Sequence, residues 1–167
     1  YTSRVKRLLV TIYIIYLIPL IFICLNYNEC YLNIYYIIYG ILAYSNYYVV
    51  YLANIINKPI EKCVFYYYKN KATKKLNSMN NMNIIGITGS YGKTSSKNIL
   101  SDILNIKYNA LPTPKNFNTT YGIMRTINEY LDKFTDTFIV EMGAFKVGEI
   151  KELCDFVKPK YGIITTI

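Results

Sequence analysis

Histidine is absent from this chain of 167 residues, and its four cysteines, Cys24, Cys30, Cys63 and Cys154, are scattered. No Cys-x-x-Cys pair occurs and no imidazole is available, so a zinc site is not expected. Cys24 and Cys30 leave two interpretations open. They are either unrelated thiols, which we favour, or a disulfide on the oxidising side of a membrane.

Acidic residues are also scarce, with 10 Asp and Glu against 19 Lys and Arg and a formal net charge of +9. No nucleic-acid recognition motif accompanies this positive charge, so nucleic acid is not expected as a partner. Hydrophobic residues make up 53% of the chain, which is high for an ordinary soluble domain.

Charge is nearly missing from residues 8–57, where Glu29 is the one charged residue. A helix needs roughly 20 apolar residues to span a bilayer. Two stretches are about that long or longer, residues 8–25 and 31–56, and the polar residues 26–30 join them. We predict a transmembrane hairpin over residues 1–57, and the alternative is a pair of buried helices in a soluble core. A cleavable signal peptide is not expected, because the second apolar run follows at once.

Basic residues flank both predicted spans. Arg4, Lys6 and Arg7 precede the first one, and lysines follow the second at positions 58, 62, 69, 71, 74 and 75. The positive-inside rule then keeps both flanks in the cytoplasm and puts residues 26–30 outside. Residues 58–82 are expected to form a basic juxtamembrane linker whose lysines contact anionic membrane lipids.

Residues 83–167 have a different pattern, in which apolar runs of strand length alternate with amphipathic segments. This alternation predicts an α/β domain with a P-loop-type parallel sheet and crossover helices. The strands are expected near 84–88, 108–111, 137–143 and 161–167, and the helices near 94–105, 122–131 and 148–157. Ligands bind at the carboxyl ends of such strands.

A candidate phosphate loop leaves the first of these strands. Its glycines allow a tight turn, and the following helix offers free N–H groups and a positive dipole end. Lys93 is expected at the outer phosphates and the Thr94 hydroxyl at Mg²⁺. The alternative is an ordinary strand-turn-helix connection, since the common Gly-x-x-x-x-Gly-Lys spacing needs a glycine where Ile87 stands. The predicted phosphate-binding residues are Thr88, Gly89, Ser90, Tyr91, Gly92, Lys93, Thr94 and Ser95.

Glu141 ends a strongly apolar strand, where a carboxylate is costly unless something positive meets it. Mg²⁺ shared with the phosphates is the favoured partner, and a salt bridge to a lysine is the alternative. Asn116 and Asn118 lie in the polar loop 111–122. They are candidate neutral hydrogen-bonding groups for a phosphate or a substrate, unless the loop is a plain connection.

Four segments in this order, GITGSYGKTS, TPKNFNTTYG, EMGAFKVGEI and PKYGIITTI, resemble the central ATP-binding domain of the Mur ligase family. The resemblance covers Ile84 to Ile167. The family uses the shorter loop Thr-Gly-x-x-Gly-Lys-Thr/Ser, which Thr88 to Thr94 match. The sequence EMG followed by GEI resembles the branch that adds D-alanyl-D-alanine to UDP-N-acetylmuramoyl-tripeptide.

The resemblance implies an ATP- and Mg²⁺-dependent amide ligase of peptidoglycan precursor synthesis that works through an acyl phosphate. Its partners are ATP, a carboxylate-bearing precursor, and an amino acid or dipeptide. Lys93 and Glu141 become the catalytic residues, Thr94 and Glu141 the metal ligands, and Asn116 and Asn118 the residues of the γ-phosphate or acceptor side. The alternatives are a membrane-bound polyglutamate-type ligase and a non-catalytic nucleotide-binding membrane protein.

The sequence departs from the family pattern in three places. Thr119 stands where the family commonly has asparagine, and a membrane hairpin stands where soluble relatives carry a uridine-binding domain. The chain stops at Ile167, before the segment in which the family has a histidine, a modified lysine and the adenine pocket. We therefore expect a fragment of a longer protein.

Overall fold

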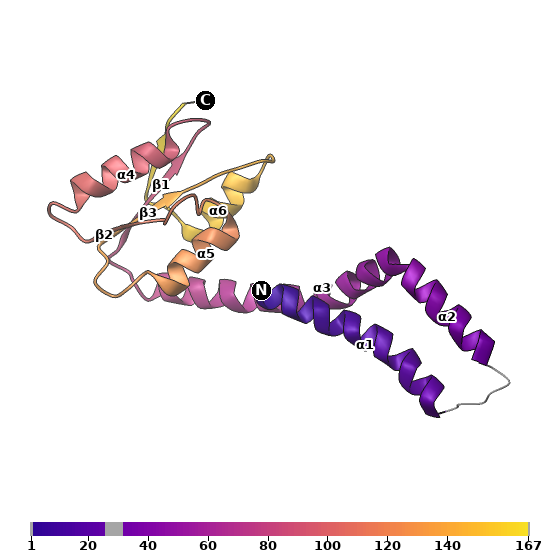
Figure 1. The fold of residues 1–167 in the computed structure, drawn as a ribbon. Coiled ribbons are helices and arrows are strands. Elements are labelled where there is room, and N and C mark those ends of the chain that lie inside the picture. The colour runs from indigo at the N-terminus through magenta and orange to yellow at the C-terminus, as the bar shows by residue number, and fades with distance from the viewer. Residues whose placement is uncertain (1, 26–31, 167) are drawn as a thin grey trace. The chain divides into compact units, whose positions relative to one another are not determined.

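The structure, a computed structural model, describes residues 2–25 and 32–166. The chain divides into two compact units, Tyr1–Tyr66 and Tyr67–Ile167. The first unit is helical and the second is built around a parallel sheet (Figure 1).

Three helices account for the N-terminal part of the chain: α1 (Ser3–Leu25), α2 (Leu32–Tyr44) and α3 (Asn46–Asn77). The second apolar stretch, expected as one span over residues 31–56, is interrupted at Ser45. There the Ser45 hydroxyl donates to the Leu42 carbonyl at 3.3 Å, a local bond that competes with the helical ladder. Helix α3 then continues as far as Asn77, through most of the segment expected as a linker. The predicted outer loop, residues 26–30, lies outside the described residues.

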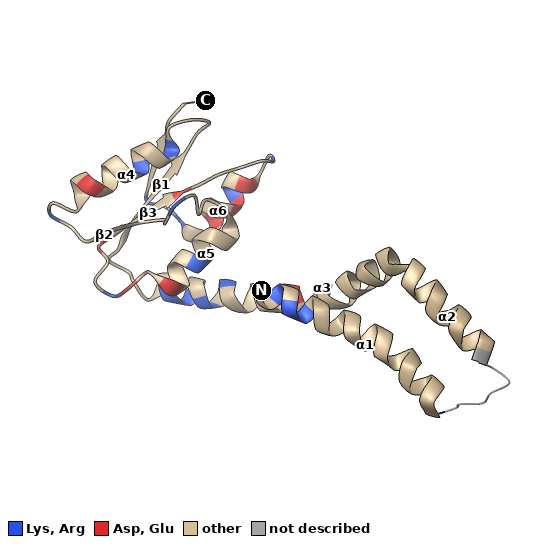
Figure 2. Cartoon of the chain, in the orientation of Figure 1, with Lys and Arg blue, Asp and Glu red and all other residues tan. Residues whose placement is uncertain are grey.

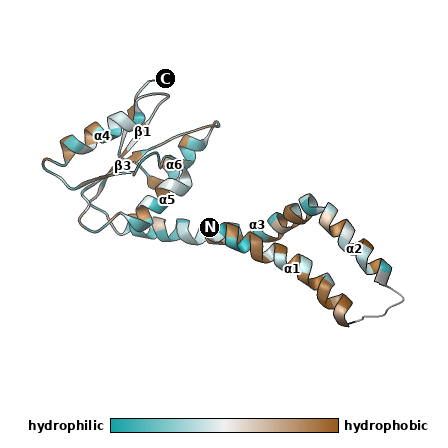
Figure 3. Cartoon of the chain, in the orientation of Figure 1, coloured by the Kyte–Doolittle hydropathy of each residue, from teal (hydrophilic) through white to brown (hydrophobic). Residues whose placement is uncertain are grey.

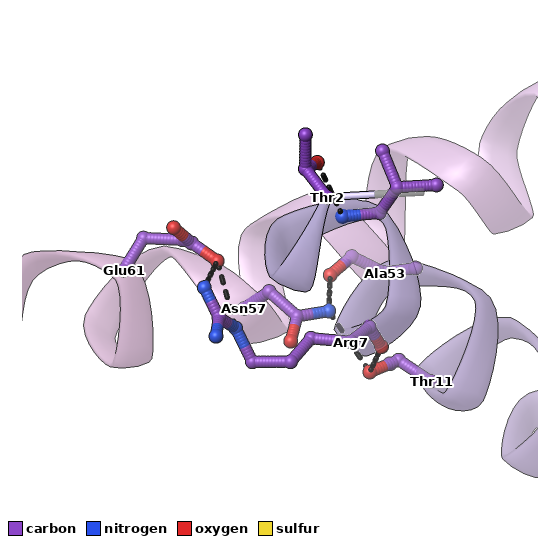
Figure 4. Close-up of polar contacts among 7 residues, drawn as sticks. Thr2, Arg7, Thr11, Ala53, Asn57 and Glu61 are labelled. Atoms are coloured by element: carbon purple, nitrogen blue, oxygen red, sulfur yellow. Dashed lines mark hydrogen bonds and ion pairs between the residues drawn. The ribbon is translucent and has the colours of Figure 1, made fainter. Parts of the chain in front are cut away.

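Helix α1 packs antiparallel to the first half of α3 through small and polar side chains. Ala53 is fully buried, and the neighbouring Asn57 donates to the Thr11 hydroxyl at 2.9 Å. Near the N-terminus, Arg7 forms an ion pair with Glu61 at 2.7 Å (Figure 4). These contacts fix the register of the two helices, because each polar group has one matching partner on the other helix.

Hydrophobic residues make up much of α1 and alternate with more polar ones along α2 (Figure 3). Large side chains are exposed on both apolar helices, among them Ile18 at 61%, Phe22 at 64% and Ile41 at 62%. Within the described residues, one helix, α1, is long and apolar enough to cross a membrane, and α2 is a shorter apolar helix. Exposed apolar side chains in this number are typical of a region that contacts a membrane or another protein.

The second unit confirms the predicted α/β class and all seven predicted elements, with shifted ends. Its strands are β1 (Asn83–Thr88), β2 (Ala110–Pro112), β3 (Thr137–Glu141) and β4 (Tyr161–Ile164), and its helices are α4 (Lys93–Leu104), α5 (Thr120–Glu129) and α6 (Glu149–Val157). All recorded strand pairs are parallel, in the order β2-β3-β1-β4.

Both faces of the central strand β3 are buried, which explains its unbroken apolar sequence. Ile139 packs with Ile87 of β1 and with Leu100 and Leu104 of α4. Because successive residues of a strand point to opposite faces, Phe138 points away from α4. Helices α5 and α6 lie on that other side of the sheet (Figure 1).

The end of α3 belongs to this second unit. Ala72 is fully buried, and the Lys75 ammonium donates to the Asn128 carbonyl of α5 at 3.4 Å. The Asn128 amide in turn donates to the Tyr68 carbonyl at 3.1 Å. The basic segment is therefore a helix, attached at its C-terminal end to the sheet domain.

The three cysteines that the structure describes, Cys24, Cys63 and Cys154, are free thiols. Cys30, the candidate partner of Cys24, lies outside the described residues. The proposed pairing of these two cysteines therefore stays a prediction.

Candidate functional site

The order of the strands brings the two predicted catalytic segments together. Strands β1 and β3 are neighbours, with Ile87 in register with Glu141. Their carboxyl ends therefore lie side by side, and the loop that leaves β1 faces the carboxylate that ends β3. This edge of a parallel sheet is where ligands bind.

Two glycines shape the loop between β1 and α4. Gly89 has φ 141° and Gly92 has φ 80°, both of which disfavour a side chain. A Cβ at Gly89 would also overlap the hydroxyl of Thr165, which follows β4. That hydroxyl lies 2.6 Å from the Tyr91 carbonyl and fastens the loop to the end of β4. Thr165 was not predicted as part of the site, because it is far from the loop in the sequence and no motif connects the two.

Lys93 curls back over this loop. Its ammonium donates to the carbonyls of Gly89 at 2.6 Å and Ser90 at 3.2 Å. The side chains of Ser90, Tyr91 and Ser95 are exposed, and that of Tyr91 is 79% exposed. The loop thus offers the Lys93 ammonium and backbone groups to a ligand, while its exposed side chains leave room beside them. A site for an anion requires such groups.

Glu141 lies at the centre of a cluster of polar side chains, and only 1% of its surface is exposed. Its Oε2 accepts hydrogen bonds from the Thr94 hydroxyl and from the Lys97 ammonium, each at 3.0 Å. Its Oε1 accepts one from the Asn118 amide at 3.3 Å. The structure therefore brings together Thr94, Glu141 and Asn118 of the predicted site. The Asn116 side chain is exposed, and Asn116 takes part through its carbonyl, which accepts from the Asn118 N–H at 2.9 Å.

Lys97 is a member of the site that sequence reasoning did not find. It is 1% exposed, and besides Glu141 its ammonium also binds the Lys115 carbonyl. Lys115 has φ 49°, a left-handed conformation that a non-glycine residue seldom adopts. The alternative prediction for Glu141, a salt bridge to a lysine, is therefore found in the structure, with Lys97 as that lysine. The sequence feature that could have identified Lys97 was its position, one helical turn after Lys93.

The same geometry can be tested for its fit to Mg²⁺. No group of three His, Cys, Asp or Glu side chains occurs in the described parts of the chain, so the protein alone does not cage a metal. However, Mg²⁺ takes one or two protein oxygens and completes an octahedron with waters and phosphates. Thr94 Oγ1 and Glu141 Oε2 are 3.0 Å apart, which is about the edge of an octahedron with metal–oxygen bonds of about 2.1 Å. The two oxygens therefore fit adjacent Mg²⁺ ligands.

Gly143 and Thr119 have local roles in holding the asparagine loop. The Gly143 N–H donates to the Asn118 carbonyl at 2.8 Å, and a Cβ at Gly143 would lie 2.9 Å from the Asn118 side chain. Thr119 is the N-cap of α5, since its hydroxyl accepts from the Gly122 N–H at 3.3 Å. The threonine found where the family commonly has asparagine thus starts a helix.

Glu149, in the GEI segment, organises the loop between β3 and α6. Its carboxylate accepts hydrogen bonds from the N–H groups of Phe145 at 2.6 Å and Lys146 at 3.1 Å. The bond from Phe145, followed by that from Lys146, lowers the pKa of Glu149 below its ordinary value of 4.5.

We expect acid to loosen this loop. Because the folded-state pKa is lowered, the contribution of Glu149 is complete above its ordinary pKa and is lost as the pH falls through the folded value. Amide NMR signals of Phe145 and Lys146 should therefore shift together, with a midpoint below pH 4.5. Glu149→Gln should abolish this titration, and signals that do not move in the parent protein would contradict the assignment.

Comparison with known proteins matches residues 87–167 to the family model Mur ligase middle domain. A Synechocystis UDP-N-acetylmuramoyl-tripeptide–D-alanyl-D-alanine ligase is 39% identical over 84 residues, which is 50% of this chain and 18% of that protein. The enzyme of the same name from Rickettsia prowazekii is 31% identical over 116 residues, 70% of this chain and 24% of that protein. The chain thus spans about a fifth of the length of the curated relatives it matches.

Solved structures give the same result for the fold. MurF ligase from Thermotoga maritima in complex with ADP superimposes with a TM-score of 0.57 and 30% identity, over 62% of this chain and 24% of that one. MurF from Acinetobacter baumannii gives a TM-score of 0.55 and 29% identity, over 58% and 21%.

Proposed function

We propose that the protein is an ATP-dependent amide ligase of peptidoglycan precursor synthesis, because residues 87–167 match the family model Mur ligase middle domain. The observation that carries the proposal is the 3.0 Å contact between Thr94 Oγ1 and Glu141 Oε2. It joins a phosphate-type loop to a buried carboxylate at neighbouring strand ends, the arrangement that phosphoryl transfer needs. The likeness to D-alanyl-D-alanine ligases supports addition of that dipeptide to a UDP-N-acetylmuramoyl-peptide.

In the proposed reaction the γ-phosphoryl group of ATP moves to a substrate carboxylate oxygen. The bond to ADP breaks and an acyl phosphate forms. The incoming amine then attacks the acyl carbon, so that a C–N bond forms, phosphate leaves and the amine loses a proton. This chain contributes positioning and positive charge, because phosphoryl transfer requires little covalent chemistry from the protein.

Each residue of the loop has a task in this proposal. Lys93 exchanges its carbonyl partners at Gly89 and Ser90 for the outer phosphates, and the backbone N–H groups of the loop bind the rest. Thr94 and Glu141 would hold Mg²⁺, which would neutralise phosphate charge. Lys97 keeps its bonds to the Lys115 carbonyl and to Glu141 and so holds the carboxylate in place.

The test is amide formation by the protein expressed from its natural gene. We expect ATP-dependent incorporation of labelled D-alanyl-D-alanine into a UDP-N-acetylmuramoyl-tripeptide, with release of ADP and phosphate. Incorporation of glutamate into a growing chain instead would favour the polyglutamate-type ligase. Nucleotide binding without either product would favour a non-catalytic membrane protein.

We further propose that residues 1–57 anchor the enzyme in the membrane, with α1 as one crossing and α2 plus the start of α3 as the other. Support comes from the exposed apolar surface and from the distribution of charge. Lys and Arg lie at the start of α1 and along the second half of α3, while the described parts between them are uncharged (Figure 2). This distribution favours a cytoplasmic sheet domain.

A topology experiment tests the anchor. A reporter fused after Lys75 should give a cytoplasmic signal, and one inserted between Asn26 and Cys30 an extracytoplasmic signal. The inserted reporter is the matched control, because it samples the other end of the same hairpin. An extracytoplasmic signal after Lys75 would overturn the orientation.

A further inference from the structure

A cavity of about 510 Å³ lies between α1 and α3 at the N-terminal end of the hairpin. Its lining combines charged, amide and apolar side chains from the two helices: Arg4, Val5, Leu8, Asn54, Asn57, Lys58 and Glu61. None of the proposed ligase residues takes part in it.

The cavity carries a net positive charge. Glu61 is the one acidic residue of the lining, and its Oε1 already accepts two bonds from Arg7, at 2.7 and 3.0 Å (Figure 4). Arg4 and Lys58 are left, and across the described part of the chain neither side chain has a hydrogen-bond or ion-pair partner. Two uncompensated cations facing one cavity favour an anion, and a phosphate group satisfies both.

The cavity lies at the boundary of the apolar hairpin. Leu8 and Asn57, which delimit the nearly uncharged stretch of the sequence, both line it. Asn57 is 6% exposed, and its amide donates to the Thr11 hydroxyl, which links α3 to α1, and to the Ala53 carbonyl one turn earlier in α3. The lining thus combines the cations Arg4 and Lys58 with the apolar side chains of Val5 and Leu8.

We infer that this cavity binds the phosphate headgroup of an anionic membrane lipid, with Arg4 and Lys58 as its ligands. A lipid matches both kinds of residue in the lining, because its headgroup meets the two cations while the start of its acyl chains contacts Val5 and Leu8. A free phosphate uses only the cations. The inference rests on the proposed membrane anchor and is independent of the ligase activity.

The experiment is lipid titration of the full chain in neutral detergent, with native mass spectrometry to count bound lipids. Phosphatidylglycerol should bind with a stoichiometry of one, and phosphatidylcholine, whose choline offsets the phosphate charge, should bind more weakly. Arg4→Gln combined with Lys58→Gln should weaken phosphatidylglycerol binding by about 30-fold, from two lost contacts near the membrane surface. Helix content by circular dichroism verifies that the variant folds.

A matched control removes the same charge outside the cavity. Lys6 and Lys62 are exposed and do not line it, so Lys6→Gln with Lys62→Gln should change the affinity by a few-fold at most. Equal losses in both double variants would show only general attraction to surface charge and overturn the site. Displacement of the lipid by millimolar inorganic phosphate would also overturn the lipid assignment. Neither outcome depends on amide formation, so failure of the site and failure of the proposed ligase are distinguishable.

Discussion

Replacing Lys97 with methionine is expected to destabilise the sheet domain by about 3–5 kcal/mol, because Glu141 then becomes a buried charge without its partner. The pair is 3.0 Å apart and both side chains are 2% exposed, so solvent cannot replace the lost ammonium. The Lys115 carbonyl loses its donor in the same variant. Amide hydrogen exchange of β3, followed by mass spectrometry in the full chain, measures the loss.

Two further variants separate the buried pair from a general effect of substitution. Lys151→Met is the matched control, since Lys151 is an exposed lysine on helix α6, and exchange in β3 should stay at the parent rate. Lys97→Met combined with Glu141→Gln removes both charges, and should be less destabilised than the sum of the two single variants. Parent-like exchange in Lys97→Met would show that Glu141 is not held by this ion pair.

The outline of the sheet domain could be predicted from the sequence because its signals are local. Apolar runs of strand length, a glycine turn and amphipathic helical segments each depend on residues close together in the chain. The Gly-Lys-Thr segment and the acid at the end of TFIVE belong to the same class of signal. These two segments meet at one edge of the parallel sheet only if β1 and β3 are neighbours. The residues near either strand in the sequence do not specify this strand order.

The residues that sequence reasoning missed are those whose roles depend on distant contacts. A lysine is usually expected at the surface. Lys97 is buried because its ammonium binds the Glu141 carboxylate, 44 positions away, and the Lys115 carbonyl, 18 positions away. Thr165 acts on a loop 74 positions earlier in the chain. The interruption at Ser45 was missed for a related reason. The span was predicted from the number of apolar residues in the stretch. That number does not show that a serine side chain bonds to the preceding turn.

Replacing Lys93 with alanine is expected to lower kcat/KM for amide formation by about 10²–10³-fold, the usual cost of removing one positive group that stabilises a transition state. Lys93 differs from Lys97 in the groups that accept hydrogen bonds from its ammonium. Among the residues that the structure describes, its ammonium contacts only carbonyls of its own loop. Its loss therefore leaves the core intact, and exchange in β3 should match the parent. Reduced activity with an unchanged fold distinguishes a catalytic role from a structural one.

Two comparisons make the Lys93 result specific. Lys107→Ala removes an exposed lysine beyond the far end of α4 and should leave kcat/KM within about twofold of the parent. Lys93→Arg keeps the positive charge but changes the point charge to a planar fork, so it should restore part of the activity. If Lys93→Ala retained parent kinetics in the protein from its natural gene, the loop would be an ordinary connection between strand and helix. The buried Glu141 cluster would then be a structural ion pair, because nothing else in the described chain would bring a phosphate to it.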